Sequence, residues 1–347
     1  MKIMAAMSGG VDSSAAAALL VERGHEVVGA TLRLFSGGNL NNSKDIDDAR
    51  DVCQRLGIEH RVIEAEAAFS REVIGRFASG YAAGITPNPC LDCNRHIKFG
   101  LLLDEAKRLG CDRLATGHYA RLETDEESGR TLLFKAEDRS KDQSYVLYSL
   151  TQDMLAHAIF PLNGMGKEAV RNYASELGLD IADKPDSQDI CFVKDGDYTE
   201  FLMRECGLKP IPGNFSDRDG NILGTHGGII GYTVGQRRGL GLSFGRRAYV
   251  TGKDAQSNII IIGENDELYS KEILVKDPNF IPFDRLDGPM KISAKIRYSH
   301  AESPAEIIPE SGDFVRVIFE NPQRAAAPGQ GAVFYQGDLI IGGGRII

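Results

Sequence analysis

The first 120 or so residues alternate between two hydrophobic periodicities, and this alternation is the strongest constraint on the fold. Apolar runs of strand length occupy residues 2–6, 27–32, 60–63 and 113–116. Patterns typical of helices lie between or after them, over residues 13–23, 44–56, 67–83 and 95–109. Such alternation predicts an α/β domain with a parallel sheet flanked by helices, and ligands bind such sheets at the carboxyl ends of the strands.

The remainder of the chain changes character twice. Residues 122–135 predict a hairpin that turns at Glu127-Ser128-Gly129, and residues 167–177 predict a helix that ends before Gly178. From about residue 207 glycine becomes dense and helical patterns disappear. Short β-rich segments follow at residues 248–251, 258–262, 291–297 and 314–319. We therefore expect an α/β catalytic domain over 1–205, a small central β-rich domain over 206–267, and a C-terminal β-barrel domain over 268–347.

Charge and cysteine usage indicate the cellular setting. No apolar run approaches the ~20 residues of a membrane span, and the N-terminus lacks a secretory pattern, so we expect a cytoplasmic protein with reduced cysteines. Cys53, Cys111 and Cys206 are each isolated, and we predict ordinary packing roles for them. The net charge of −9 disfavours nucleic acid, but residues 226–253 hold five Lys or Arg and no acid. An RNA-binding surface would therefore lie mainly on the C-terminal half.

A glycine-rich loop follows the first predicted strand, with the sequence Met7-Ser8-Gly9-Gly10-Val11-Asp12-Ser13-Ser14. Backbone amides at such a helix start bind anions, and the hydroxyls of Ser8 and Ser13 would add donors. Asp12 would cap the helix or hold Mg²⁺. The loop lacks the lysine of a Walker A motif, so cleavage at a terminal phosphate is not favoured. The alternative is a glycine turn with a Ser/Asp helix cap.

Two cysteines lie in a proline-rigidified loop, Thr86-Pro87-Asn88-Pro89-Cys90-Leu91-Asp92-Cys93-Asn94. We expect a helix to begin at about Arg95, so that its dipole, with Arg95 and Lys98, lowers the pKa of Cys93. Cys191 is a third candidate thiol. A C-x-x-C pair is typical of zinc, redox or iron–sulfur sites, but no second pair completes a four-ligand zinc site.

These motifs resemble known families. The string SGGVDSS after an N-terminal strand resembles the pyrophosphate loop of the N-type ATP pyrophosphatases. The whole chain resembles the tRNA-specific 2-thiouridylases, through the cysteine loop and further blocks. These blocks are ATGHYAR (115–121), KDQSY (141–145), GYTVGQRRGLGL (231–242), KIRY (295–298), APGQ (327–330) and GGG (342–344).

The resemblance implies an ATP- and Mg²⁺-dependent enzyme that replaces the 2-carbonyl oxygen of the wobble uridine in tRNAs for Lys, Glu and Gln with sulfur. The uridine would be flipped into the site and adenylated. Cys191 would carry a persulfide, Cys93 would release the sulfur from it, and Asp12 would complete the catalytic set. ATP would contact Ala6, Met7, Ser8, Gly9, Gly10, Val11, Asp12, Ser13, Leu32 and Gly117.

The same resemblance implies a tRNA-binding surface formed by Asn88, Pro89, Cys90, His118, Lys141, Asp142, Gln143, Arg237, Arg238, Arg297, Tyr298 and Gln330. Simpler interpretations exist for some of them. His118 fits a satisfied core histidine, the two adjacent arginines fit a solvated face, and Tyr298 fits the packed end of a barrel.

One departure is Cys90, because many family members carry Asp at this position. Cys90, Cys93 and Cys191 supply three thiols, the number that a four-iron cluster with one open iron requires. Such a cluster, holding hydrosulfide, is an alternative to the persulfide. We expect tRNA and a sulfur-donor protein or sulfide source as partners, no membrane, and a monomer. The rival functions are an amide ligase that adenylates a small-molecule carbonyl, and a non-catalytic RNA-binding protein.

Overall fold

The computed structural model of the chain describes residues 1–37, 40–179, 181, 190–193, 196–242 and 247–347. Its N-terminal sheet has five strands in the order β5-β2-β1-β6-β9, and all neighbouring strands are parallel. The strands are β1 (Lys2–Ala6), β2 (Glu26–Arg33), β5 (Glu59–Glu64), β6 (Arg113–Ala115) and β9 (Ala158–Ile159). The predicted parallel sheet is confirmed. A separate short ribbon pairs β3 (Ser36–Gly37) with β4 (Leu40–Asn41).

Helices cover both faces of this sheet, as the side chains of β1 show. Ile3 and Ala5 pack into one core with the alanines of α1, whereas Met4 packs into the opposite core with Phe99 and Leu102. This alternation is the two-residue period of a strand buried on both sides. The first face carries α1 (Val11–Glu22), α2 (Ser43–Leu56) and α8 (Lys167–Glu176).

Two long helical runs cross the middle of the molecule. One comprises α3 (Glu66–Phe69), the π-helical η1 (Ser70–Gly75) and α4 (Arg76–Ala82). The other comprises α5 (Pro89–Asp92), the π-helical η2 (Cys93–Leu102) and α6 (Leu103–Arg108). Shorter helices are η3 (Ser144–Val146), α7 (Gln152–Ala156), α9 (Tyr198–Arg204), η5 (Ile229–Gly231) and η6 (Asp266–Leu268).

The helix that carries the C-x-x-C pair begins earlier than predicted. It starts at Pro89 and not near Arg95, because the Asn88 side chain caps it by accepting a hydrogen bond from the Cys90 amide at 3.1 Å. Proline is well suited to the first helical position, where its missing N–H has no intrahelical partner. Cys90 therefore lies in the first turn, and Cys93 lies one turn further in.

The C-terminal half contains two β units, as predicted. A four-stranded sheet has the order β11-β10-β13-β12. Its strands are β10 (Gly213–Ser216), β11 (Ile222–His226), β12 (Tyr249–Asp254) and β13 (Ile259–Gly263). Six further strands, in the order β14-β17-β16-β15-β18-β19, close into a barrel through pairing of β14 with β19. They are β14 (Tyr269–Phe280), β15 (Met290–Lys295), β16 (Ser303–Pro309), β17 (Phe314–Arg324), β18 (Gly331–Gln336) and β19 (Leu339–Ile346).

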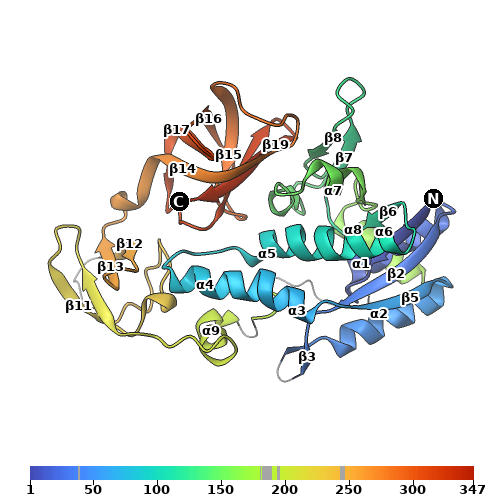
Figure 1. Ribbon diagram of the computed structural model, residues 1–347, viewed down its shortest axis with the longest axis horizontal. Coiled ribbons are helices and arrows are strands. Elements are labelled where there is room, and N and C mark those ends of the chain that lie inside the picture. Colours follow the sequence, from blue (N-terminus) through green and yellow to red (C-terminus); the bar gives the residue numbers. More distant parts are fainter. Residues whose placement is uncertain (38–39, 180, 182–189, 194–195, 243–246) are drawn as a thin grey trace.

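The barrel lies over the helical runs, with the N-terminal sheet and the small central sheet at opposite ends of the molecule (Figure 1). The predicted hairpin, β7 (Arg121–Thr124) and β8 (Thr131–Phe134), joins the edge of the barrel sheet through the pair Phe134–Leu339. The first domain thus contributes strands to the last one. We keep 206 and 268 as the proposed starts of the second and third domains.

Three cysteines were predicted to be packing residues. Cys53 and Cys111 are buried, and Cys206 is half-buried against the aromatic core around Phe77 and Phe192. Within the described ranges, each helix is either too short or too polar to span a lipid bilayer.

Candidate functional site

The glycine-rich loop connects β1 to α1 at the carboxyl edge of the parallel sheet. Gly9 adopts φ +69°, and a Cβ on it would come within 2.5 Å of the Asp45 carbonyl oxygen on α2. Gly117, which follows β6, approaches the loop from the other side, and a Cβ there would lie 2.8 Å from the Ser13 amide nitrogen. Both glycines are therefore required by close backbone packing. Leu32, at the end of β2, completes this edge.

Side chains within the loop bond to one another. The hydroxyl of Ser13 accepts from the Ser8 amide at 3.1 Å and donates to the Gly10 carbonyl at 2.9 Å. The N-terminal amides of α1 face out of the helix at this point, which is the geometry of an anion site. The predicted capping role of Asp12 is wrong, since Gly10 is the cap residue and no side chain caps the helix.

Asp12 instead binds a lysine that the sequence did not identify. Lys167 Nζ, at the start of α8, contacts the two carboxylate oxygens of Asp12 at 2.7 and 2.8 Å, and Tyr119 donates to the same carboxylate at 2.7 Å. The lysine side chain is only 12% exposed. A cation therefore lies beside the glycine loop although the loop has none of its own. The only signal in the sequence was a Gly-Lys step before a helical pattern.

The two segments that carry the candidate thiols pack into one aromatic cluster, to which Cys93 and Phe192 both belong. Besides desolvation, negative charge on Cys93 or Cys90 raises the pKa of Cys191. The segment that carries Cys191 is anchored by its neighbour Phe192, which packs against Phe69 and Phe77. Two thiols about a hundred residues apart in the chain therefore share one site. Lys98, on η2, is the nearby cation for all three thiols.

The predicted lowering of the Cys93 pKa is wrong. Desolvation by burial raises the pKa of Cys93 to about 11 and that of Cys191 to about 12, and it outweighs the opposing effect of Lys98. Cys90 and Cys191 nevertheless keep exposed surface, whereas Cys93 is half-buried. Arg95 does not assist, because its guanidinium donates to the Ser149 carbonyl instead.

His118 is buried and contacts Lys98, the lysine near the thiols. Its ring contacts Thr116 Oγ1 at 2.7 Å and Lys98 Nζ at 3.5 Å, and it packs between Phe99 and Phe160. Burial, with a smaller effect of Lys98, holds the pKa of His118 well below 6.5. It is therefore neutral at pH 7. In the free protein this histidine supports the lysine next to the thiols, and its 6% exposure leaves little surface for RNA.

The buried histidine predicts a loss of stability in mild acid. Below pH 6.5 the unfolded chain protonates His118 whereas the folded chain does not, so stability falls as the pH falls. Between roughly pH 7 and 5.5 this group alone should reduce the free energy of unfolding by about 1 kcal/mol. Urea unfolding at the two pH values should show a correspondingly smaller difference for His118→Gln. An unchanged difference would contradict the assignment.

Several predicted tRNA-binding residues surround a pocket of about 250 Å³. It is lined by Thr86, Thr233, Arg297, Tyr298, Ser299 and Gln330, so all three predicted domains contribute to it. Cys90 lies close enough to raise the pKa of Tyr298. A larger hollow of about 590 Å³ lies on the barrel around Lys271 and Lys291, but none of the candidate site residues lines it.

The predicted RNA-binding residues differ in how far their side chains are already engaged within the protein. Asp142 and Gln143 have structural partners, since the Asp142 carboxylate accepts from Ser144 and the Gln143 side chain accepts from the Tyr119 amide. Arg297 likewise donates to two backbone carbonyls, of Val234 and Ala325. Arg237 and Arg238 are exposed, whereas Lys141 is half-buried. Asn88 and Pro89 form the start of the cysteine helix.

No metal centre is evident in the part of the chain that the structure describes. No three His, Cys, Asp or Glu side chains there are grouped so that they could hold one metal ion. The three thiols share a site without forming such a group, and zinc gains no support. A four-iron cluster places its cysteine ligands on different irons. The cluster thus stays a prediction.

Comparison with known proteins gives one family over the whole chain. Residues 1–195 match the tRNA methyl transferase HUP domain, 199–264 the tRNA methyl transferase PRC-barrel domain, and 270–346 the aminomethyltransferase beta-barrel domain. The tRNA-specific 2-thiouridylase MnmA of Acetivibrio thermocellus is 48% identical over 99% of this chain and 99% of its own length. The MnmA of Desulfitobacterium hafniense is 48% identical over 100% of this chain and 98% of its own. The chain belongs to the tRNA-specific 2-thiouridylases.

This membership confirms the predicted family, its fold and the prediction of an enzyme. The domain descriptions mention methyl transfer, whereas the whole-chain relatives are named thiouridylases. The whole-chain relatives define the family, because near-complete coverage at this identity is more specific than a domain description. Among solved structures, the U34-tRNA thiolase NcsA from Methanococcus maripaludis with its [4Fe-4S] cluster covers 59% of this chain and 66% of its own. Its TM-score of 0.37 at 20% identity is too low to support a conclusion about this 2-thiouridylase chain.

Proposed function

We propose that this protein thiolates the wobble uridine of tRNAs for Lys, Glu and Gln at C2, using ATP and Mg²⁺. The observation that carries the proposal is a series of contacts from the glycine loop toward the thiols. Gly117 packs against the loop, the adjacent His118 contacts Lys98, and Lys98 is the cation that acts on all three thiols. ATP would bind over the loop from Ala6 to Ser13, between Leu32 and Gly117. Asp12 would hold the magnesium ion, and the neighbouring Lys167 would contact phosphate.

The first step is adenylation. The uridine 2-carbonyl oxygen attacks the α-phosphate of ATP, pyrophosphate leaves, and N3 of the base gives up its proton. The helix dipole and the amides of α1 stabilise the charge that develops on the phosphates. The base must leave the anticodon stack for C2 to be reached, as base chemistry on nucleic acids generally requires.

The second step is sulfur transfer. The terminal sulfur of a Cys191 persulfide attacks C2 and expels AMP, which leaves a disulfide between Cys191 and the base. The Cys93 thiolate then attacks the Cys191 sulfur, forms a Cys93–Cys191 disulfide and releases the 2-thiouridine, which takes up a proton at N3. A dithiol reductant supplies two electrons to restore both thiols, and a sulfur donor reloads Cys191.

The raised thiol pKa values fit a site whose cysteines react slowly while tRNA is absent. At neutral pH both cysteines are protonated, so neither attacks adventitious electrophiles rapidly. Lys98 lowers the pKa of both thiols, so its positive charge would stabilise the thiolate that forms during sulfur transfer.

The test is reconstitution with bulk tRNA, ATP, a persulfide compound as the sulfur donor and a dithiol reductant, scored by mass analysis of digested nucleosides. We expect 2-thiouridine to accumulate, and pyrophosphate release to be stimulated by tRNA but not by amino acids or free nucleotides. Stimulation by a small carbonyl compound instead of tRNA would favour the amide-ligase alternative. Tight tRNA binding without pyrophosphate release would favour a non-catalytic RNA-binding protein.

The exposed arginine pair predicts a change in salt dependence. Arg237→Gln/Arg238→Gln should weaken tRNA binding and reduce the slope of log K against log salt by about 1.5, because two fewer phosphates are neutralised. Filter binding at several salt concentrations, from roughly 50 to 200 mM, measures this slope. Arg50→Gln on α2 serves as the control and should keep the slope. An unaltered slope in the double variant would place RNA elsewhere.

The iron–sulfur alternative has its own measurement. Anaerobic purification followed by iron and labile-sulfide analysis should find the metal if Cys90, Cys93 and Cys191 bind a cluster. Full thiolation by iron-free protein would eliminate it.

A further inference from the structure

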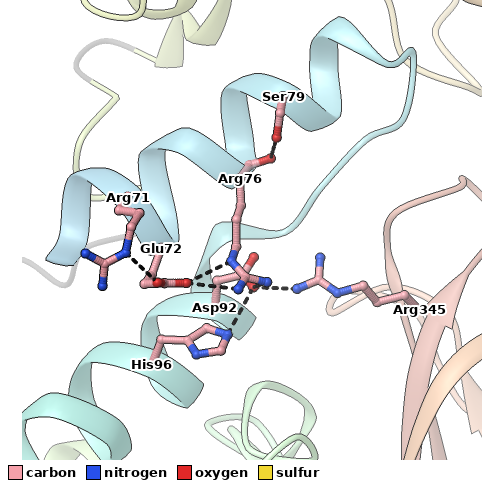
Figure 2. Close-up of polar contacts among 7 residues, drawn as sticks. All are labelled: Arg71, Glu72, Arg76, Ser79, Asp92, His96 and Arg345. Atoms are coloured by element: carbon pink, nitrogen blue, oxygen red, sulfur yellow. Dashed lines mark hydrogen bonds and ion pairs between the residues drawn. The ribbon is translucent and has the colours of Figure 1, made fainter.

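A buried carboxylate lies inside the C-x-x-C segment. Asp92, between the two cysteines, is 2% exposed. Arg345 Nη2 donates to Asp92 Oδ1 at 2.5 Å, although 253 residues separate the two in the chain. Arg345 belongs to β19, the last strand of the barrel, and reaches the helix from the side opposite α4 (Figure 2). The cysteine helix is thereby bonded directly to the barrel.

Other contacts of this carboxylate are weaker. Arg76 Nη1 lies 3.9 Å and His96 Nε2 4.0 Å from the same oxygen. Arg76 is itself held by Glu72, which accepts from it at 2.9 and 3.1 Å (Figure 2). Asp92 Oδ2 is buried and has no hydrogen-bond partner among the described residues. Arg345 is thus the one close partner of Asp92 in the described structure.

The barrel also holds the chain just before the cysteine helix. The Thr86 amide donates to the Pro328 carbonyl at 2.7 Å, and the Gln330 side chain donates to the Thr86 carbonyl at 2.8 Å. Gly331, next along the chain, is the strand partner of Arg345. The same edge of the barrel therefore forms hydrogen bonds to the chain on both sides of Cys90, at Thr86 and at Asp92.

We propose that Asp92 and Arg345 are positioning residues for sulfur transfer, which aim the sulfurs of Cys90 and Cys93 by fixing the start of the cysteine helix against the barrel. The proposal rests on the proposed function, in which Cys93 releases sulfur from Cys191. It gives the barrel a part in the chemical step that is separate from any contact with RNA.

Helix geometry connects the ion pair to the thiols. Residues three apart share a helix face, so Cys90 and Cys93 point the same way, and Asp92 is one helical step of ~100° from Cys93. Fixing Asp92 against β19 therefore sets the rotation of this face. Without Arg345, the buried carboxylate must find water or another cation, and the turn must shift for it to do so. Misplacement of a reacting group by ~1 Å costs about 100-fold in rate.

The test separates the two half-reactions in the full-length protein. Arg345→Gln should lower the kcat for 2-thiouridine formation by about 30- to 100-fold, while the KM for tRNA and tRNA-stimulated pyrophosphate release stay within about threefold. The double variant Asp92→Asn/Arg345→Gln replaces the ion pair with a neutral amide pair and should recover most of the rate. Arg316→Gln, on the exposed face of the same barrel, is the matched control and should behave as wild type.

A second readout does not depend on turnover. Peptide mass mapping after N-ethylmaleimide treatment should show faster labelling of Cys90 and Cys93 in Arg345→Gln than in wild type, with Cys206 unchanged. Unaltered thiolation in Arg345→Gln would overturn the inference, as would an equal loss of pyrophosphate release and thiolation, or a double variant no better than the single one. An inactive wild-type protein would count against the proposed function instead.

Discussion

Replacing Cys191 with serine is expected to abolish 2-thiouridine formation, lowering its rate by at least about 1,000-fold. A hydroxyl cannot carry the persulfide sulfur that attacks C2, so no slower route through the same residue remains. Cys93→Ser should cause a comparable loss, because the disulfide between Cys191 and the base would no longer be resolved. Nucleoside mass analysis after single-turnover reaction measures both.

The two variants should differ in what accumulates. Cys93→Ser should trap tRNA covalently on Cys191, seen as a band that a reducing agent removes, whereas Cys191→Ser should trap none. Both should keep tRNA-stimulated pyrophosphate release, since the thiols act after adenylation. Cys206→Ser, at a half-buried cysteine with no assigned role in the reaction, is the control and should remain active. Retained thiolation in Cys191→Ser would refute its assigned role.

Gly117→Ala is expected to lower kcat/KM for ATP by about 100-fold or more. The added Cβ would lie 2.8 Å from backbone atoms of Asp12 and Ser13, and backbone cannot move aside as a flexible side chain can. The start of α1, or the segment after β6, must therefore shift. Either movement displaces the amides that we assign to the phosphates of ATP.

The effect should be specific to the nucleotide. Initial rates of tRNA-stimulated pyrophosphate release at varied ATP give kcat/KM, and tRNA binding should stay within a few-fold of wild type. Gly288→Ala is the matched control, because no atom lies within 4 Å of a Cβ built there. A normal kcat/KM for ATP in Gly117→Ala would place the nucleotide away from this junction.

Local sequence patterns predicted most of the secondary structure. The strand over Lys2–Ala6 has the expected bounds, and the helix predicted over residues 13–23 spans Val11–Glu22, since strand and helix periods are properties of short segments. The start of the cysteine helix was placed six residues too late. The pattern of apolar residues begins near Arg95, but Asn88 caps the helix and Pro89 is its first residue. Both residues favour a helix start because of their own chemistry, and hydrophobic periodicity does not register such preferences.

Residue chemistry in the sequence also identified the components of the site. The glycine loop, the C-x-x-C pair and Cys191 were recognised from residue type and order, and the resemblance to one family connected them. The direction of the thiol pKa shift was missed, because the expected helix dipole is a local effect whereas the desolvation that dominates depends on the whole surrounding fold.

The sequence by itself determined the parallel sheet, the anion-binding loop and the set of thiols, because each is encoded in a contiguous stretch of chain. Only the tertiary structure decided which charges meet. Asp12 pairs with Lys167 across 155 residues, and Asp92 pairs with Arg345 across 253. Ion pairs of this kind form where packing brings two distant segments together, and the periodicity of the sequence holds no information about such long-range contacts.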